Sequence, residues 1–237
     1  VYVGFSGGSH ARNIALANLD MVPYTAGFGH FGSKIVPVTG MMNGCMTAPE
    51  TRKAIDDWGA LQSAIYGPYG PLSWSHGDES FYAGNPDACW SETCLAAFRE
   101  FLKGRYSGLE TLNAEWKTGY KTWDAVLPLT FEDAVKSSNY APWVEHRLAQ
   151  QLVWARNYEY TGRALSVHDP HAHVGFDGNN GFNLPNGGIN WWVLKDHVGE
   201  LHGYLRNSEE MEIFRSFAGP GHLSGMWYGT YGPTWAI

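Results

Sequence analysis

Short apolar runs alternate with longer stretches of helical periodicity along the chain. Six of these runs have the length of a strand: Val1–Phe5, Met21–Ala26, Leu72–Asp78, His173–Phe176, His197–Tyr204 and Ser224–Tyr231. Strands that alternate with helices in this way are typical of βα units, in which the strands are mainly parallel. The pattern therefore predicts an α/β fold.

Two helices are predicted between the third and fourth strands. Residues Glu92–Tyr106 carry apolar side chains at the i, i+3 and i+7 positions of one face, and Ser91 stands at the N-cap position. A second helix is predicted from Pro142 to about Val167, with the proline in its first turn. The faces that we expect to be buried are Leu95, Phe98 and Leu102 in the first helix and Val144, Leu148, Leu152 and Ala155 in the second.

Six parallel strands are two short of a closed (β/α)8 barrel. No internal repeat or linker interrupts the chain, so we expect one domain over residues 1–237. The chain starts on one predicted strand and stops soon after another, which predicts a TIM-type barrel that lacks its first and last units. The alternative is an open six-stranded α/β sheet.

Composition narrows the class of protein. The chain has 16 Lys and Arg against 23 Asp and Glu, a net charge of −7, and no basic cluster, which argues against a nucleic-acid partner. No apolar run approaches the ~20 residues of a membrane span. Aromatic residues make up 15% of the chain and glycines number 29, which suits ring-lined surfaces for sugars or, equally, an aromatic core. Composition leaves the compartment open.

The third predicted strand ends in two adjacent acidic residues, Asp78 and Glu79. Successive strand residues point to opposite sides, so one of these carboxylates can face a cleft while the other braces it. A cleft-facing carboxyl beside a ring such as that of Trp74 would be desolvated, and its raised pKa would suit a general acid. The alternative is a pair of N-capping or solvated loop acids.

A long motif follows these carboxylates. After His76-Gly-Asp-Glu79 come Cys89-Trp-Ser-Glu-Thr-Cys94-Leu-Ala-Ala-Phe-Arg-Glu-Phe-Leu-Lys-Gly-Arg-Tyr106 and Ser107-Gly-Leu-Glu-Thr-Leu-Asn-Ala-Glu-Trp116. This run resembles the family 42 β-galactosidases and their relatives in clan A of the glycoside hydrolases, most closely over Gly77–Pro128. The resemblance implies a TIM barrel, a carbohydrate substrate and a retaining reaction. It also implies that Glu79 is the general acid/base, at the end of barrel strand 4.

The chain departs from the family pattern at two places. Asp78 stands where the family usually has an Asn that holds the sugar 2-hydroxyl, and Asp accepts a hydrogen bond but cannot donate one as an amide does. The family nucleophile ends strand 7, but here no acidic residue follows Glu212. Either the nucleophile lies beyond Ile237 or its role has moved; Asp177 and Glu200 are our candidates for a second carboxylate.

Further sugar contacts are expected from residues at the predicted strand ends, because these ends converge at the mouth of a barrel. The aromatic and polar residues that we expect there are Tyr24, His76, Asn179, Trp227 and Tyr231. The alternatives are packing inside the barrel for the rings and ordinary turn chemistry for the asparagine.

Three cysteines are too few for a disulfide framework, and their count leaves a single bridge, three thiols or a metal site open. The family resemblance implies a structural zinc held by Cys45, Cys89 and Cys94, with Ser91 at the position of a further family cysteine. A vestigial thiol cluster and a disulfide from Cys45 to Cys89 or Cys94 are the alternatives.

The sequence thus predicts a glycoside hydrolase of β-galactosidase type, without a catalytic cofactor. A carbohydrate-binding or scaffold barrel that has lost its nucleophile is the main alternative. A metal-dependent hydrolase built on His168, His171 and His173 is a second, although these residues lack the glutamate partner of zincin motifs. Relatives are often oligomers, so the resemblance also implies a homo-oligomer.

Overall fold

The computed structural model describes residues 2–5, 8–23, 35–36, 41–42, 45–78, 87, 89–167, 169–177, 189–203 and 208–226. It contains six strands that match the six predicted runs: β1 (Tyr2–Phe5), β2 (Asp20–Pro23), β5 (Trp74–Asp78), β6 (Val174–Asp177), β7 (Glu200–Gly203) and β8 (Leu223–Met226). A short antiparallel pair, β3 (Ile35–Val36) and β4 (Met41–Met42), was not predicted.

The six predicted strands form three parallel ladders, β1 with β2, β5 with β6 and β7 with β8. Single backbone hydrogen bonds connect one ladder to the next. The Leu72 amide donates to the Met21 carbonyl at 2.8 Å, and the Gly199 amide donates to the Val174 carbonyl at 2.9 Å. The parallel strands therefore follow one another in space in the order in which they occur in the chain, as strands do in a (β/α) barrel.

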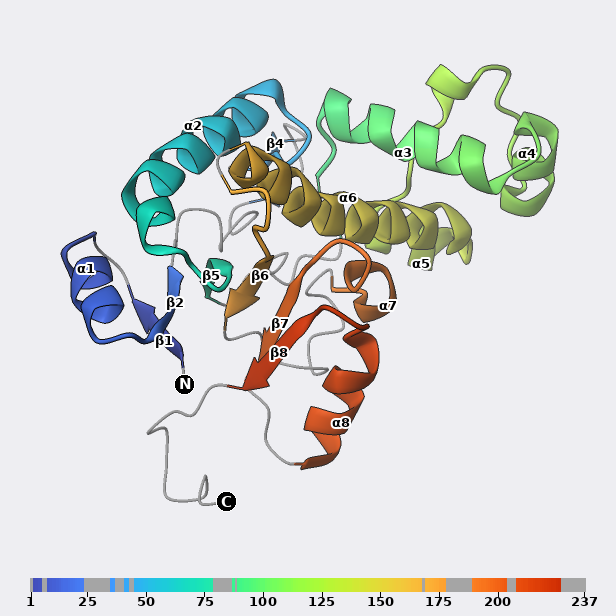
Figure 1. Cartoon of the computed structure of the whole chain (residues 1–237). Helices are drawn as coiled ribbons and strands as arrows, with labels where there is room; N and C mark the ends of the chain where they lie inside the picture. The colour runs from blue at the N-terminus through green and yellow to red at the C-terminus, as the bar shows by residue number, and fades with distance from the viewer. Residues whose placement is uncertain are drawn as a thin grey trace.

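Helices separate these strands and cover them on the outside (Figure 1). The helices are α1 (Gly8–Leu16), α2 (Pro49–Tyr66), α3 (Glu92–Arg105), α4 (Leu109–Trp116), α5 (Phe131–Ser137), α6 (Ala141–Ser166), α7 (Trp191–Leu194) and α8 (Ser208–Phe217), with 3-10 turns η1 (Gly67–Tyr69) and η2 (Trp123–Ala125). Within the described residues, no helix combines the length and apolar character needed to cross a bilayer.

The predicted helix after Ser91 is confirmed as α3. Its N-cap is the one predicted, because the Ser91 hydroxyl accepts a hydrogen bond from the Cys94 amide. Phe98 and Leu102 are buried as expected, whereas Leu95 is only half-buried and Cys94 takes its place on the buried face.

The predicted apolar stripe of α6 is confirmed only in part, because Ala155 is buried but Leu148 and Leu152 are half-buried. Pro142 does lie in the first turn, but Val144 is 40% exposed, and the buried face carries His146, Gln150 and Asn157 among apolar residues. The physical reason is that α6 packs against α2, α3 and α7 as well as β6, so residues around most of its circumference are covered (Figure 1). A helix covered from several sides does not keep one apolar stripe.

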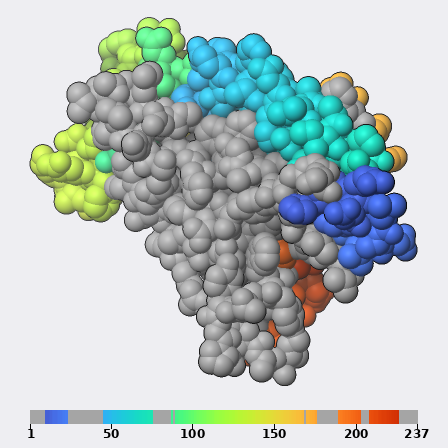
Figure 2. Space-filling model, turned by 90° about the vertical axis from the view of Figure 1, so that its left-hand side faces the viewer, coloured from blue at the N-terminus to red at the C-terminus, as the bar shows by residue number. Residues whose placement is uncertain are grey.

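Two hydrophobic clusters hold these elements together. One joins the strands to α2, α6 and α8 and includes Trp74, Tyr158, Val174, Leu201 and Phe214. The other fills the space between α3, α4 and α6 and includes Phe98, Leu102, Leu112, Trp116 and Val126. Figure 2 shows the blue segment that contains α1 beside the cyan segment that contains α2, on one face of the molecule.

Glycine permits the closest approaches between elements. A Cβ at Gly175 of β6 would collide with the carbonyl oxygen of Glu200 in β7. A Cβ at Gly59 of α2 would lie 3.0 Å from the Cβ of Ala164 in α6, tighter than ordinary packing. These two glycines let β7 and α2 lie directly against their neighbours.

Candidate functional site

The acidic residues predicted to end two strands lie side by side. Asp78 is the last residue of β5, Asp177 is the last residue of β6, and the two are register partners in the parallel ladder. Adjacent strands are about 4.8 Å apart, so the fold places side by side the backbones of two acidic residues that are 99 positions apart in the chain. Both stand at the carboxyl ends of their strands, where barrel enzymes place catalytic groups.

The register of β5 shifts just before this point. Ser75 pairs with Gly175, but Asp78 pairs with Asp177, so β5 has one extra residue between the two pairs. His76 lies within this bulge. Bulges are common at the rims of barrels and beside active sites because they change the direction of the residues that follow.

Several predicted site residues fall outside the described residues, and their roles stay predictions. They are Tyr24, Glu79, Asn179, Trp227 and Tyr231, together with His168 of the histidine-rich segment. Glu79 follows Asp78 directly in the sequence.

Glu200 is placed differently from Asp177. It is the first residue of β7, is 3% exposed, and its carboxylate accepts a hydrogen bond from the buried hydroxyl of Ser73. Ser73 precedes β5, so both residues belong to the amino ends of their strands. Glu200 is thus at the opposite end of the strands from Asp78 and Asp177, in the interior, which favours Asp177 as the second carboxylate.

The three cysteines converge in one buried cluster. The Sγ atom of Cys45 lies 3.4 Å from that of Cys94 and 3.6 Å from that of Cys89, and all three lie within 4.8 Å of one another. In the part of the chain that the structure describes, this is the group of Cys, His and acidic ligand atoms close enough to share a metal ion. All three are free thiols, because these distances far exceed the ~2.05 Å of a disulfide bond.

The spacing of the thiols fits a zinc ion. With Zn–S bonds of about 2.3 Å, tetrahedral coordination places sulfur atoms about 3.8 Å apart, close to the distances found here. Cys89 is also held at a φ of +25°, a conformation that non-glycine residues rarely adopt. Backbone strain of this kind persists where the surroundings fix a functional group in place.

The hydroxyl groups of Ser91 and Thr47 also contact the three thiols. The Ser91 Oγ atom lies 3.0 Å from the Cys45 Sγ atom, and the Thr47 Oγ1 atom lies 3.2 Å from the Sγ atoms of both Cys45 and Cys94. Hydrogen bonds from Cys89 and Cys94 lower the pKa of the Cys45 thiol, whereas hydrogen bonds with Cys45 and Cys89 raise the pKa of Cys94. Of these two thiols, Cys45 is thus the one whose deprotonated form its neighbours favour.

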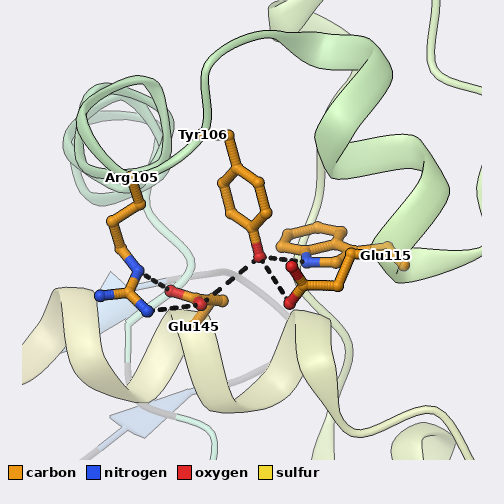
Figure 3. Close-up of polar contacts among 5 residues, drawn as sticks. Arg105, Tyr106, Glu115 and Glu145 are labelled. Atoms are coloured by element: carbon orange, nitrogen blue, oxygen red, sulfur yellow. Dashed lines mark hydrogen bonds and ion pairs between the residues drawn. The ribbon is translucent and has the colours of Figure 1, made fainter.

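A second polar cluster lies at the other end of α3, where Tyr106, Trp116 and Glu145 are buried and Arg105 and Glu115 are exposed (Figure 3). The Arg105 guanidinium pairs with the Glu145 carboxylate of α6 through contacts of 2.8 Å and 3.1 Å. The Tyr106 hydroxyl donates to Glu115 at 3.0 Å and accepts from the Trp116 indole at 3.1 Å. Burial raises the pKa of Tyr106 to about 12; the hydrogen bond from Trp116 opposes this shift, and the carboxylates of Glu115 and Glu145 add to it.

This second cluster explains much of the long sequence motif. Arg105, Tyr106 and Trp116 are motif residues, and all three join α3 and α4 to α6. Asn113 holds the turn after α4, because its amide donates to the Tyr120 carbonyl and its side-chain oxygen accepts from the Tyr120 amide. The partner Glu145 was not identified from the sequence, where it resembles an ordinary helix carboxylate.

Comparison with known families identifies the same segment. The sequence model of glycoside hydrolase family 42, described as Beta-galactosidase, matches residues 37–160, which is about half of the chain. The matched range contains the three cysteines, Glu79 and the second polar cluster. A β-galactosidase from Geobacillus kaustophilus is 38% identical over 52 residues, which are 20% of this chain and 8% of that protein.

Solved structures agree on the fold. The β-galactosidase from Rahnella sp. R3 superposes with a TM-score of 0.63 at 15% identity, over 83% of this chain and 30% of that chain. The catalytic domain of a β-amylase from Paenibacillus polymyxa superposes with a TM-score of 0.58 at 16% identity, over 96% of this chain and 74% of that chain. These neighbours are TIM-barrel glycosidases. The chain spans about a tenth of the curated relative and under a third of the β-galactosidase structure.

Proposed function

The chain belongs to glycoside hydrolase family 42, the β-galactosidases, and from this premise we propose that it hydrolyses β-galactosides with Glu79 as the general acid/base. The observation that best supports the proposal is the pairing of Asp78 with Asp177 at the carboxyl ends of β5 and β6. This pairing puts the backbone of a second acidic residue beside Asp78, the residue that precedes Glu79 in the sequence.

The proposed reaction follows from two carboxylates on adjacent strands. Glu79 protonates the leaving oxygen of the glycosidic bond, and Asp177 attacks the anomeric carbon from the opposite side. Retaining enzymes hold these groups about 5 Å apart. We propose retention of configuration by analogy with the family, with Asp78 accepting a hydrogen bond from a sugar hydroxyl.

We also propose that the six parallel strands are consecutive strands of a TIM barrel. Their order in space follows their order in the chain, and a helix follows each of the strands from β1 to β7 before the next parallel strand begins. An open doubly wound sheet would instead reverse its strand order at a switch point.

Hydrolysis of a panel of p-nitrophenyl glycosides tests the activity and the role of Glu79 together. We expect turnover of the β-galactoside by the wild type and a loss of roughly 10²-fold or more in kcat for Glu79→Gln, because a general acid contributes roughly 10²–10⁴-fold. Glu115→Gln, on α4 and far from the strand ends, is the matched control and should keep its activity. Equal activity of wild type and Glu79→Gln would contradict the proposal.

The anomeric configuration of the first product tests the second carboxylate. Asp177→Asn should lose activity as severely as Glu79→Gln, whereas Glu200→Gln should leave the chemistry in place and affect stability, since Glu200 is buried beside Ser73. Proton NMR during wild-type hydrolysis should show the β-anomer first. Initial formation of the α-anomer would reject the retaining mechanism.

We propose that Cys45, Cys89 and Cys94 hold a structural zinc ion. The ion would tie the segment before α2 to the start of α3, and the hydroxyl of Ser91 or Thr47 lies nearest to the fourth coordination position. Measurement of metal content on the purified protein should give about one zinc per chain and three reactive thiols after chelation. A metal-free protein with three reactive thiols would support the vestigial cluster, and one with a single reactive thiol would support a disulfide.

A further inference from the structure

A cavity of about 380 Å³ is lined by side chains of α2, of α6 and of the segment before β7. Helices α2 and α6 run side by side (Figure 1). Its lining comes from three parts of the chain: Arg52 of α2; Arg156, Glu159, Tyr160 and Arg163 of α6; and His197 of the segment before β7. Three of these six residues are arginines, in a protein whose net charge is −7.

One arginine of the cavity is already compensated. Arg163 forms an ion pair with Glu159 in the next turn of α6, and the same carboxylate contacts the Nδ1 atom of His197 at 3.0 Å. The hydrogen bond from Arg163 lowers the pKa of Glu159, so this carboxylate is ionised near neutral pH. Glu159 thus contacts both Arg163 and His197, and its single negative charge compensates the charge of Arg163.

The other two arginines have no carboxylate partner among the described residues. The Arg52 guanidinium lies 4.2 Å from the centre of the Tyr160 ring, and its Nη1 atom is buried without a hydrogen-bond acceptor in the described part of the chain. The Tyr160 hydroxyl donates to Asp56 at 3.2 Å, which fixes the ring under Arg52. Arg156 is exposed, and no described acidic residue lies within ion-pair distance of it.

Three arginines against the carboxylates of Glu159 and Asp56, the latter bonded to Tyr160, leave a local charge of about +1, and one guanidinium nitrogen of Arg52 is already desolvated. A buried guanidinium nitrogen without an acceptor is unfavourable unless a ligand supplies one. Arginine donates two parallel hydrogen bonds to phosphate or carboxylate, and these are among the strongest hydrogen bonds in proteins. The volume falls in the range of small-molecule sites, with room for a sugar-sized group beside one oxyanion.

We propose that this cavity binds a small molecule that carries a phosphate group, with the oxyanion held by Arg52 and Arg156. Tyr160 positions Arg52, and Glu159 orients Arg163 and His197 at the rim. The site uses none of the residues assigned to glycoside hydrolysis, and it goes beyond that activity. The ligand is either free inorganic phosphate or a phosphorylated sugar. Only the phosphorylated sugar has a sugar ring that would occupy the rest of the cavity.

Calorimetric titration of the full chain at low ionic strength tests the proposal, because salt screens such contacts. The three probes are inorganic phosphate, glucose 6-phosphate and neutral glucose. We expect both phosphates to bind and glucose not to bind. Tighter binding of glucose 6-phosphate identifies a phosphorylated sugar as the ligand, and equal binding identifies the free anion.

Three variants assign the binding to the cavity. Arg52→Gln and Arg156→Gln should each weaken phosphate binding roughly tenfold or more, the effect expected for a lost charge-assisted hydrogen bond. Arg215→Gln removes a surface arginine that pairs with Glu212 on α8, and should bind phosphate as the wild type does. Arg156 is exposed, so its replacement keeps the fold even if Arg52→Gln does not. Absence of phosphate binding by the wild type, or equal binding by Arg156→Gln and Arg215→Gln, would overturn the proposal.

Discussion

Two polar clusters lie at opposite ends of α3, and they differ in the charges that they contain. The second polar cluster pairs the Glu145 carboxylate with the Arg105 guanidinium, so it holds a cation of its own beside this buried acid. The thiol cluster of Cys45, Cys89 and Cys94 contains thiols and hydroxyls but no basic side chain. The thiol cluster is therefore the one for which a metal cation is proposed.

This difference separates two kinds of information in the family motif. The residues of the second polar cluster specify how α3, α4 and α6 pack. None of them belongs to the strand ends that carry Asp78 and Asp177. A strong motif match over this segment therefore reports the architecture of the family. Chemistry has to be assigned from the strand ends instead.

The largest effect is expected at the thiol cluster. If zinc is bound, Cys94→Ser should cost several kcal/mol in the free energy of unfolding, because metal-binding free energy contributes directly to folding. The measurement is the thermal midpoint of wild type and variant, each with and without a chelator. The chelator should lower the wild-type Tm markedly and leave the variant unchanged. A wild-type Tm that does not respond to the chelator would remove the proposed difference between the two clusters.

A smaller loss in the free energy of unfolding, of about 2–4 kcal/mol, is expected when the ion pair between Arg105 and Glu145 in the second polar cluster is broken. The two partners should differ, because the Glu145 side chain is 8% exposed and that of Arg105 is 48% exposed. Arg105→Ala leaves a carboxylate buried without a partner, whereas Glu145→Gln leaves a guanidinium that water can reach. Urea unfolding should therefore show a larger loss for Arg105→Ala. The opposite order would mean that the burial of Glu145 does not control the energetics.

Tyr106 makes the stabilising effect of the second polar cluster sensitive to alkaline pH. Its folded-state pKa of about 12 lies above the ordinary value of 10.0, so the folded protein holds this proton more tightly than the unfolded chain does. The contribution of this proton to the free energy of unfolding is fully present below pH 10. It is lost as the pH rises toward 12 and amounts to roughly 1–3 kcal/mol in total. Unfolding free energies measured between pH 9 and pH 11.5 should fall more steeply for the wild type than for Tyr106→Phe. Parallel slopes would contradict this assignment.

The smallest effect is expected from Ser91, which caps α3 and also faces the thiols. Ser91→Cys should lower the stability of the metal-free protein by about 1 kcal/mol, because cysteine is a poorer N-cap than serine. The same change should increase zinc affinity, because a fourth thiolate completes the coordination. Competition with a chromophoric chelator measures the affinity. An unchanged affinity would place the fourth ligand elsewhere.

Much of the fold could be predicted from local patterns. The six parallel strands and α3 are marked by short apolar runs, by i, i+3 and i+7 spacing and by the Ser91 cap. Helix α2 was not predicted, because its buried residues are Thr51, Ile55, Gly59, Ser63 and Tyr66, which do not form an apolar stripe. The buried face of α6 was misjudged for the related reason that packing on several sides buries polar residues.

The sites were predictable in different degrees. The three cysteines were grouped by family resemblance, but only the fold shows that Cys45 and Cys89 bring their sulfur atoms within 3.6 Å. The neighbouring positions of Asp78 and Asp177 depend on the β5–β6 register, which no local pattern contains. The arginine cavity was not anticipated, since Arg52 and Arg156 each look like part of a solvated helix face until the two helices pack.

Leaving-group dependence tests the central claim, glycoside hydrolysis with Glu79 as the proton donor, most directly. The measurement compares Glu79→Gln with wild type on p-nitrophenyl β-galactoside and on lactose, whose leaving alcohol is far more basic and needs protonation. We predict that the variant loses much more activity on lactose than on the nitrophenyl substrate. Equal losses on both substrates, or none on either, would contradict the assignment of Glu79 as the acid.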